Sequence, residues 1–293
     1  MPMRTGIDIS PTTVTAAQIK TGKSGWSLFA SARMSRSSES PELESSEARR
    51  LESLLFRRGF TSAPCVINAP EDALTSSTLE LPPATSGAPI DKLARAEFAR
   101  RNQLEQDDFV LSYWGLPSNG PGNQVMAVGC LTAPTDACID SLESAGLSVA
   151  GVDDPARAMG RLLSNIPSTT TVRVGARVES WGTCIVVLHH GTMLYSRSPI
   201  GLTLDVAPGE HAEFAGRLGQ EIEACVSFAR HRSRSHAPAG VSILGEGAHS
   251  STLMQSLARK FGDSIGQPVT TNGEQIDATL APAIGLALLE DIA

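Results

Sequence analysis

Apolar and β-branched residues open the chain in two short runs that are separated by a polar turn. Residues 6–9 form the first run, and residues 14–20 form the second. Two such runs joined by a turn are typical of a β-hairpin. Residues 26–33 predict a third strand, and residues 35–46 form a Ser-rich, acidic linker. The pattern therefore predicts that the chain begins with three consecutive strands.

Helical and strand periodicities alternate through the next part of the chain. Leu51, Leu54 and Leu55 give residues 44–58 an apolar face at helical spacing. Strands are predicted at residues 65–69 and 75–81. The block that follows reads as helix, two strands, helix and strand, at residues 90–104, 109–116, 124–132, 134–145 and 147–152, with turn chemistry at 117–123. We interpret this block as an inserted α+β unit.

The second half of the chain repeats the pattern of the opening. After a helix at 155–163 and a linker at 164–168, the order is strand, polar turn and two strands, at 171–174, 175–182, 184–188 and 193–198. This recurrence at Gly6 and Gly175 indicates an internal duplication, although identity between the copies is negligible. The remaining predictions are a helix, a strand, a helix, a strand and a terminal helix, at 209–230, 241–244, 249–261, 267–270 and 277–289.

The first turn carries the strongest candidate chemistry. Asp8 lies just before the turn, and Ser10, Thr12 and Thr13 crowd it with hydroxyl groups. Backbone N–H groups in such a turn can face an anion, and a carboxylate can hold a metal-bound water. The combination suits a nucleotide phosphate with its magnesium. The alternative is an ordinary polar hairpin with no ligand.

Composition narrows the classes of protein. The chain has 293 residues, 41% of them hydrophobic, which is enough for two domains with substantial cores. A net charge of −7 argues against a nucleic-acid binder. The five cysteines are scattered without a CxxC pair, so we expect reduced thiols in a cytosolic setting and no metal site. Arg4 and Asp8 interrupt any signal peptide, and no apolar run is long enough to span a bilayer.

Several short motifs, in order, resemble the PilM family of type IV pilus assembly proteins, which belongs to the actin-like ATPase superfamily. The motifs are Leu79-Glu80-Leu81-Pro82, Ala96-Glu97, Asp107-Asp108-Phe109-Val110, Ala145-Gly146-Leu147, Val152-Asp153 and Ala283-Ile284-Gly285-Leu286-Ala287-Leu288. The resemblance implies an α/β, duplicated ribonuclease H-like fold. It implies a first actin-like domain at 1–163 with an insertion at about 82–150, and a second domain at 164–293.

The resemblance also implies a function. A PilM-like protein is a cytoplasmic scaffold, held at the inner membrane through its partner, in a pilus or type II secretion platform. It binds a short N-terminal peptide of a PilN-like membrane protein in a groove beside the inserted unit. Residues 75–81 and 90–104 would border that groove, and Leu79, Leu81, Leu93 and Glu97 are the candidate peptide contacts.

The nucleotide motifs depart from the family pattern. In the first turn, Ser10 replaces a glycine and Thr15 replaces a lysine that reaches phosphate. In the second phosphate turn, Arg173-Val174-Gly175 stands where the family has a motif that contains an acid. A cation cannot ligate magnesium. The Gly245-Glu246-Gly247 turn adds a carboxylate, whose repulsion of a phosphate is on the order of a few kcal/mol. We therefore expect ATP binding to be weak or lost, and no catalysis.

If nucleotide binding is retained, ATP and magnesium would be the cofactors. The residues that would hold them are Gly6, Asp8, Ser10, Thr12, Thr13, Gly175, Gly245 and Gly247. Asp8 would orient a metal-bound water and Asp153 would position an attacking water. The alternative for both acids is a polar cap or a salt bridge.

Other functions stay open. An ATP-driven switch of the same machinery is the alternative to the scaffold. A small-molecule kinase would need a catalytic acid that we do not find, and a filament former would share the fold. The basic run at 230–236 is either a solvated helix end or a contact with anionic lipid.

Overall fold

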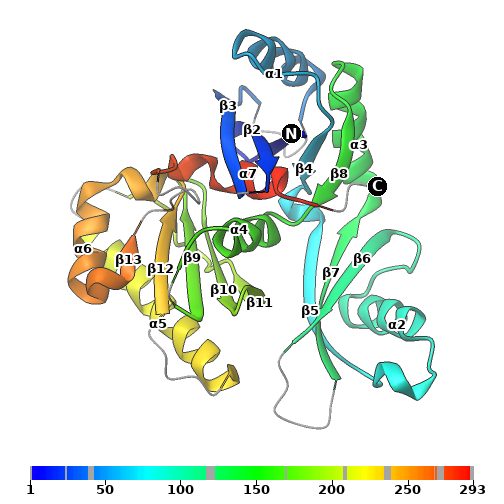
Figure 1. Cartoon of the computed structure of the whole chain (residues 1–293). Helices are drawn as coiled ribbons and strands as arrows, with labels where there is room; N and C mark the ends of the chain where they lie inside the picture. The colour runs from blue at the N-terminus through cyan, green and yellow to red at the C-terminus, as the bar shows by residue number, and fades with distance from the viewer. Residues whose placement is uncertain are drawn as a thin grey trace.

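Two five-stranded sheets with equivalent strand orders form the framework of the chain (Figure 1). The computed structural model describes residues 2–23, 25–38, 43–116, 123–168, 170–206, 210–233, 239–266, 268 and 274–290. The first sheet has the order β3-β2-β1-β4-β8, with strands Gly25–Ser35, Thr13–Gly22, Met3–Ile9, Cys65–Asn68 and Val149–Asp153. The second has the order β11-β10-β9-β12-β13, with strands Thr192–Arg197, Thr183–His189, Val172–Val178, Ala239–Leu244 and Ile265–Gly266.

The two sheets repeat one topology. In each, three antiparallel strands are followed by two parallel ones. The hairpins also share their register: Ile9 pairs with Val14 at the end of the first, and Val178 pairs with Thr183 at the end of the second. The predicted duplication and the actin-like fold class are therefore confirmed.

One predicted turn is wrong. Residues 175–178 belong to β9, so the turn of the second hairpin covers 179–182 and not 175–182. A Cβ on Gly175 would lie 2.6 Å from a Leu163 methyl group, so the glycine serves close packing inside a sheet buried on both faces. Within β9, Arg173, Gly175 and Arg177 are residue types that suggest a turn. Val172, Val174, Ala176 and Val178 nevertheless alternate with them as the apolar face of a core strand.

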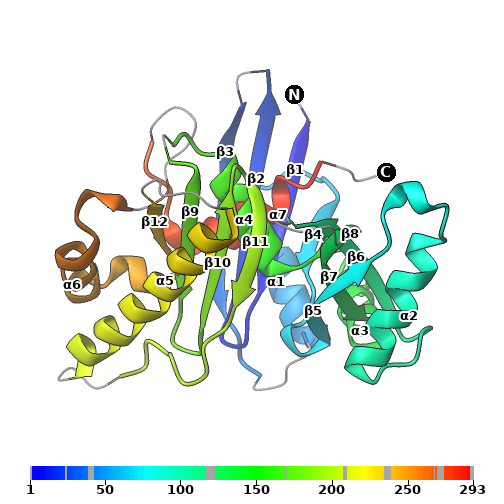
Figure 2. The same cartoon turned by 90° about the horizontal axis from the view of Figure 1, so that it is seen from below.

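Helices α4 (Pro155–Ser164) and α7 (Ala281–Ala287) lie between the two sheets (Figure 2). Their approach is close because two glycines carry no side chain. A Cβ on Gly6 of β1 would lie 2.0 Å from the carbonyl oxygen of Ala283. A Cβ on Gly285 of α7 would lie 2.0 Å from the carbonyl oxygen of Ala158. One hydrophobic core therefore runs through both sheets, and it includes Ala17, Trp26, Met159, Val186, Leu188 and Ile284.

The inserted unit is a three-stranded antiparallel sheet in the order β5-β7-β6, with strands Leu74–Leu81, Asn123–Leu131 and Phe109–Gly115. Helix α2 (Ile90–Asn102) covers one face, where Leu79, Phe98 and Phe109 are buried together. The unit contacts the second sheet through Trp114, whose indole Nε1 donates to the carbonyl oxygen of Met193 at 2.8 Å.

The other helices cover the outer faces of the five-stranded sheets (Figure 1). They are α1 (Ser45–Arg57), α3 (Thr132–Ser144), α5 (His211–Ser233) and α6 (Ser251–Phe261). Each predicted helix before residue 262 is confirmed, with ends that differ by a few residues. The terminal helix is shorter than predicted, because residues 278–280 form a 3₁₀ turn capped by Asp277.

Three predictions reach beyond the described residues. The turn at 117–123 and the strand at 267–270 lie almost entirely outside them, and so does the second half of the basic run at 230–236. Within the described part of the chain, no helix combines the length and apolarity needed to cross a membrane. The domain boundaries at 82, 150 and 163 stay predictions.

Candidate functional site

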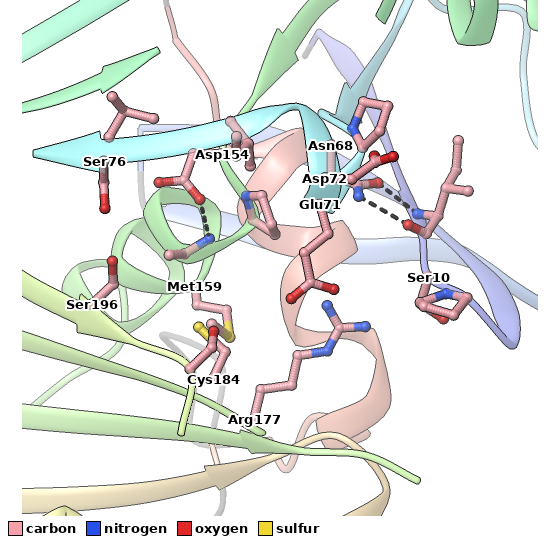
Figure 3. Close-up of a pocket in the computed structure, with 18 of the residues that line it drawn as sticks. Ser10, Asn68, Glu71, Asp72, Ser76, Asp154, Met159, Arg177, Cys184 and Ser196 are labelled. Carbon is pink, nitrogen blue, oxygen red and sulfur yellow. Dashed lines mark hydrogen bonds between the residues drawn. The ribbon is translucent and has the colours of Figure 1, made fainter. Parts of the chain in front are cut away.

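A cavity of about 680 Å³ lies where the two five-stranded sheets and the inserted sheet meet (Figure 3). The first sheet contributes the ends of β1 and β4. The inserted unit contributes the first half of β5, and the second sheet contributes β9 to β11. The side chains that matter for its chemistry are Ser10, Asn68, Glu71, Ser76, Asp154, Arg177 and Arg197.

Arg177 links the two halves at the back of this cavity. Its guanidinium donates two hydrogen bonds to the Asp8 carboxylate, at 3.1 and 2.6 Å. Its Nε donates to Glu179 Oε1 at 3.0 Å. All three side chains are nearly inaccessible to solvent, and Asp8 is 1% exposed. A bidentate, charge-assisted pair in such a site is strong once formed.

Asp8 and Arg177 hold equivalent places in the duplicated hairpins. Asp8 pairs with Thr15 one step before the end of the first ladder, and Arg177 pairs with Cys184 one step before the end of the second. The residue of the second hairpin that is equivalent to Asp8 is therefore Arg177, whereas the sequence motif indicated Arg173. Arg173 lies at the opposite end of β9, where it donates to the carbonyl oxygens of Leu163 and Ile166.

Further carboxylates surround Arg177. The Glu71 side chain points toward the guanidinium from the 3₁₀ turn Glu71–Ala73 (Figure 3). Burial raises the pKa of Glu71 above its ordinary value, and Arg177 opposes this effect. Burial likewise raises the pKa of Glu179. The excess of acid over cation means that the site favours added positive charge and disfavours added negative charge.

Asp154 is the acid of the cavity wall at the start of α4. Its side chain accepts a hydrogen bond from the Ala156 N–H at 2.8 Å and caps the helix. Burial raises the pKa of Asp154 to about 6. Asp153, which the sequence singled out, is paired with Arg161 instead, and Arg157 lies 3.8 Å away. Asp153 does not line the cavity.

A second set of contacts joins strand β3, the second hairpin turn and the Gly245–Gly247 turn. Arg33 donates to Glu246 at 2.6 Å, and the N–H of Ser180 donates to the same carboxylate at 3.2 Å. Gly245 approaches Glu179 so closely that a Cβ would lie 2.6 Å from its Oε1. A Cβ on Gly247 would lie 2.6 Å from Val178 Cβ. The second hairpin turn therefore packs on the Gly245–Gly247 turn through protein groups, and Arg33 of β3 adds an ion pair from the first sheet.

The structure brings together only some of the predicted nucleotide residues. Ser10 lines the cavity, and its hydroxyl bonds Thr13 within the turn. Thr12 is exposed at the tip. Gly6 lies under α7 and Gly175 lies in the core, so neither faces the cavity.

The four predicted peptide contacts fall into one buried pair and one pair at the surface. Leu79 and Leu81 are 0% and 5% exposed, and they pack into the core beneath α2. Leu93 on α2 is 38% exposed. Glu97 pairs with Arg100 and Arg101 at 2.8 and 2.7 Å. Only Leu93 and Glu97 are therefore available on the surface.

Sequence reasoning missed Arg177, Glu179, Glu71 and Asp154. The first two lie in a segment that was interpreted as a turn. Asp154 had a usable signal, because an acid directly before Pro155 matches a helix N-cap followed by proline at the first helical position.

These residues do not fit magnesium–ATP. The acid at the expected metal position, Asp8, has both oxygens occupied by Arg177. Glu71 points at Arg177, Glu179 accepts a hydrogen bond from it, and Glu246 accepts one from the N–H of Ser180, so added negative charge is disfavoured here. Among the described residues, no group of three or more His, Cys, Asp or Glu is arranged to hold a metal ion.

The sequence matches no protein-family model and no curated protein. Among solved structures, the chain is similar to a chain of the "PilM-PilN type IV pilus biogenesis complex", at 17% identity and TM-score 0.74 over 97% of both chains. It is similar to the ethanolamine utilization protein EutJ of Carboxydothermus hydrogenoformans, at 13% identity and TM-score 0.54 over 99% of this chain and 90% of that one.

A third similar structure is the cytoplasmic domain of EpsL, an inner membrane component of the type II secretion system of Vibrio cholerae. The identity is 12% and the TM-score 0.51, over 88% of this chain and 95% of that one. Identities this low establish the fold and not the activity. The chain therefore has the duplicated actin-like fold, with an α+β insertion, that it shares with the matched chain of the PilM–PilN complex.

Proposed function

We propose that this chain is a non-catalytic scaffold of a type IV pilus or type II secretion assembly platform. It acts at the cytoplasmic face of the inner membrane and binds a short cytoplasmic peptide of a PilN-like membrane protein. The observation that carries the proposal is the match to a chain of the PilM–PilN complex over 97% of both chains. The likeness to the cytoplasmic domain of EpsL supports the same setting.

The cavity supports peptide binding. Its volume of about 680 Å³ is within the usual range for ligand sites, roughly 300–1,000 Å³. It borders β5, which is an edge strand of the three-stranded sheet, and edge strands can pair with an extended peptide. Leu43, Val128 and Met159 provide apolar lining for side chains of the peptide. Leu93 and Glu97 on α2 would contact a peptide that continues along the inserted unit.

The ion pairs support the loss of ATP binding. Arg177 bridges Asp8, the acid that the resemblance assigns to a metal-bound water, and Glu179. A bound nucleotide would have to break these buried pairs and approach several carboxylates. Both steps are unfavourable, because unpaired buried charges are costly and like charges repel. We therefore propose that the fold keeps its two halves joined without a nucleotide.

The direct test is a titration of the purified chain with a synthetic peptide that matches the cytoplasmic N-terminus of the PilN-like protein encoded in the same genome. We expect saturable binding at micromolar peptide. Ser76, exposed on β5 and lining the cavity, provides the variant: Ser76→Trp should fill the cavity and weaken binding at least about tenfold.

Val110→Trp is the matched control. Val110 is exposed on β6, the opposite edge strand of the inserted sheet, and it neither lines the cavity nor belongs to the residues expected to border the groove. It should bind as the wild type does. Absence of binding by the wild type at high micromolar peptide would contradict the scaffold proposal.

The alternative is an ATP-driven switch of the same machinery. The position of Ser10 and Pro11 on the cavity wall is the observation that favours it. A titration with magnesium–ATP separates the two functions, because only the switch requires nucleotide affinity.

A further inference from the structure

We propose that the outward face of helix α1 binds the surface of a lipid bilayer that contains anionic lipid. This contact goes beyond the proposed function, in which the membrane partner alone brings the chain to the bilayer. The face consists of Arg49, Arg50, Ser53, Phe56 and Arg57, and Arg58 follows directly after the helix.

The first observation is a local excess of positive charge. Arg49, Arg50, Arg57 and Arg58 are all exposed. Residues 49–58 contain these four arginines and one acid, Glu52, in a chain whose net charge is −7. A cluster of cations on an acidic protein indicates a specific anionic partner, because such a protein is otherwise repelled by anionic surfaces.

The second observation is that these cations have no carboxylate partner among the described residues. Arg50 Nη1 donates to the hydroxyl of Ser37 at 3.1 Å, and Arg57 Nε donates to the carbonyl oxygen of Ser53 at 3.2 Å. By contrast, Arg36 is buried against Glu47 and Arg33 is paired with Glu246. The guanidinium groups of α1 therefore keep their charge available to a ligand.

The third observation is an exposed aromatic side chain within the same face. Phe56 is 79% exposed, whereas Ala48, Leu51 and Leu55 on the opposite side of the helix are 0%, 1% and 5% exposed. At 100° per residue, Phe56, Arg49, Ser53, Arg57 and Arg50 follow one another around the outward side. Binding at a membrane interface grows with the apolar area buried in it and with attraction to anionic lipid, and on this face Phe56 supplies the first and the arginines the second.

The shape favours a bilayer over an acidic protein. Helix α1 lies at the outside of the molecule, over the first sheet (Figure 1). The cavity described above and a smaller one beside Arg173 are both lined by residues outside α1. A flat surface can contact all the side chains of a convex helix face together, whereas an acidic peptide needs a groove to fix it.

The experiment is flotation of the full chain, without its protein partner, with vesicles of phosphatidylcholine alone or mixed with phosphatidylglycerol. We expect the chain to float only with the mixed vesicles, and less at high salt. Each cation near an anionic surface strengthens binding roughly fivefold, so the double variant Arg49→Glu, Arg57→Glu should bind at least about tenfold more weakly. Phe56→Ser should also weaken binding.

Arg100→Glu, Arg101→Glu is the matched control. It makes the same change in net charge on α2, where both arginines are exposed. We expect its vesicle binding to stay within about threefold of the wild type. Equal flotation with both kinds of vesicle, or an equal loss in the α1 variant and the α2 control, would overturn the proposal. Peptide binding by the α1 variant should be unchanged, which separates this test from that of the proposed function.

Discussion

At the residue scale, Arg177 has the largest effect we expect. It is buried between Asp8 and Glu179, and its removal would leave two carboxylates without a counter-charge. Breaking one partner of a buried ion pair typically costs about 3–5 kcal/mol. Arg177→Met should therefore lower the free energy of unfolding by about that amount, as measured by urea denaturation.

The double variant Arg177→Met, Asp8→Asn controls for loss of packing. It removes one of the two carboxylates that Arg177→Met leaves without a counter-charge. The double variant should therefore lose less free energy of unfolding than the sum of the losses in the two single variants. A loss below about 1 kcal/mol for Arg177→Met would mean that the pair does not hold the halves together.

Asp154 predicts a pH dependence at the same scale. Its folded pKa of about 6 lies above its ordinary value of 3.8. The stability that this group contributes is therefore present below about pH 3.8 and is lost as the pH rises through about 6. Asp154→Asn keeps a capping oxygen but cannot ionise.

The variant should consequently gain stability relative to the wild type as the pH rises from 4 to 7, on the order of 2 kcal/mol. Thermal unfolding at a series of pH values measures this difference. A constant difference across the series would contradict a raised pKa at Asp154.

At the element scale, the packing of α7 against β1 depends on a single glycine. A Cβ on Gly6 would lie 2.0 Å from the Ala283 carbonyl oxygen, so Gly6→Ala must displace the helix. We expect a loss of about 2–4 kcal/mol, the upper range for overpacked cores.

Gly151→Ala in β8 of the same sheet is the matched control. Its nearest neighbour would be a Leu289 methyl group at 3.8 Å, an ordinary contact, so its loss should stay below about 1 kcal/mol. Equal losses in the two variants, measured by urea denaturation, would contradict the close contact between Gly6 and Ala283 as the cause.

The sequence predicted helices and strands better than it predicted contacts between distant residues. The helices and the first hairpin carry local periodic patterns, so their positions could be predicted. Arg177 and Asp8 are 169 residues apart, and no local pattern in the sequence predicts their contact. Leu79 and Leu81 show the same limit: their alternation predicts one apolar face, but only the position of α2 decides that this face is a core and not a groove.

At the scale of the whole molecule, ion pairs join the two five-stranded sheets. Asp8 belongs to the first sheet, Arg177 and Glu179 to the second hairpin, and Arg33 and Glu246 add a more exposed link. The same core passes through α4 and α7. The chain therefore has an internal connection between its halves that is made by protein groups alone.

Calorimetric titration of the purified chain with magnesium–ATP tests this claim most directly. Because Arg177 donates to both oxygens of Asp8 and the carboxylates of Glu71 and Glu179 lie beside it, we predict no saturable heat up to millimolar nucleotide. Binding with a micromolar dissociation constant would contradict the account, since the nucleotide would then have displaced the Asp8–Arg177 pair.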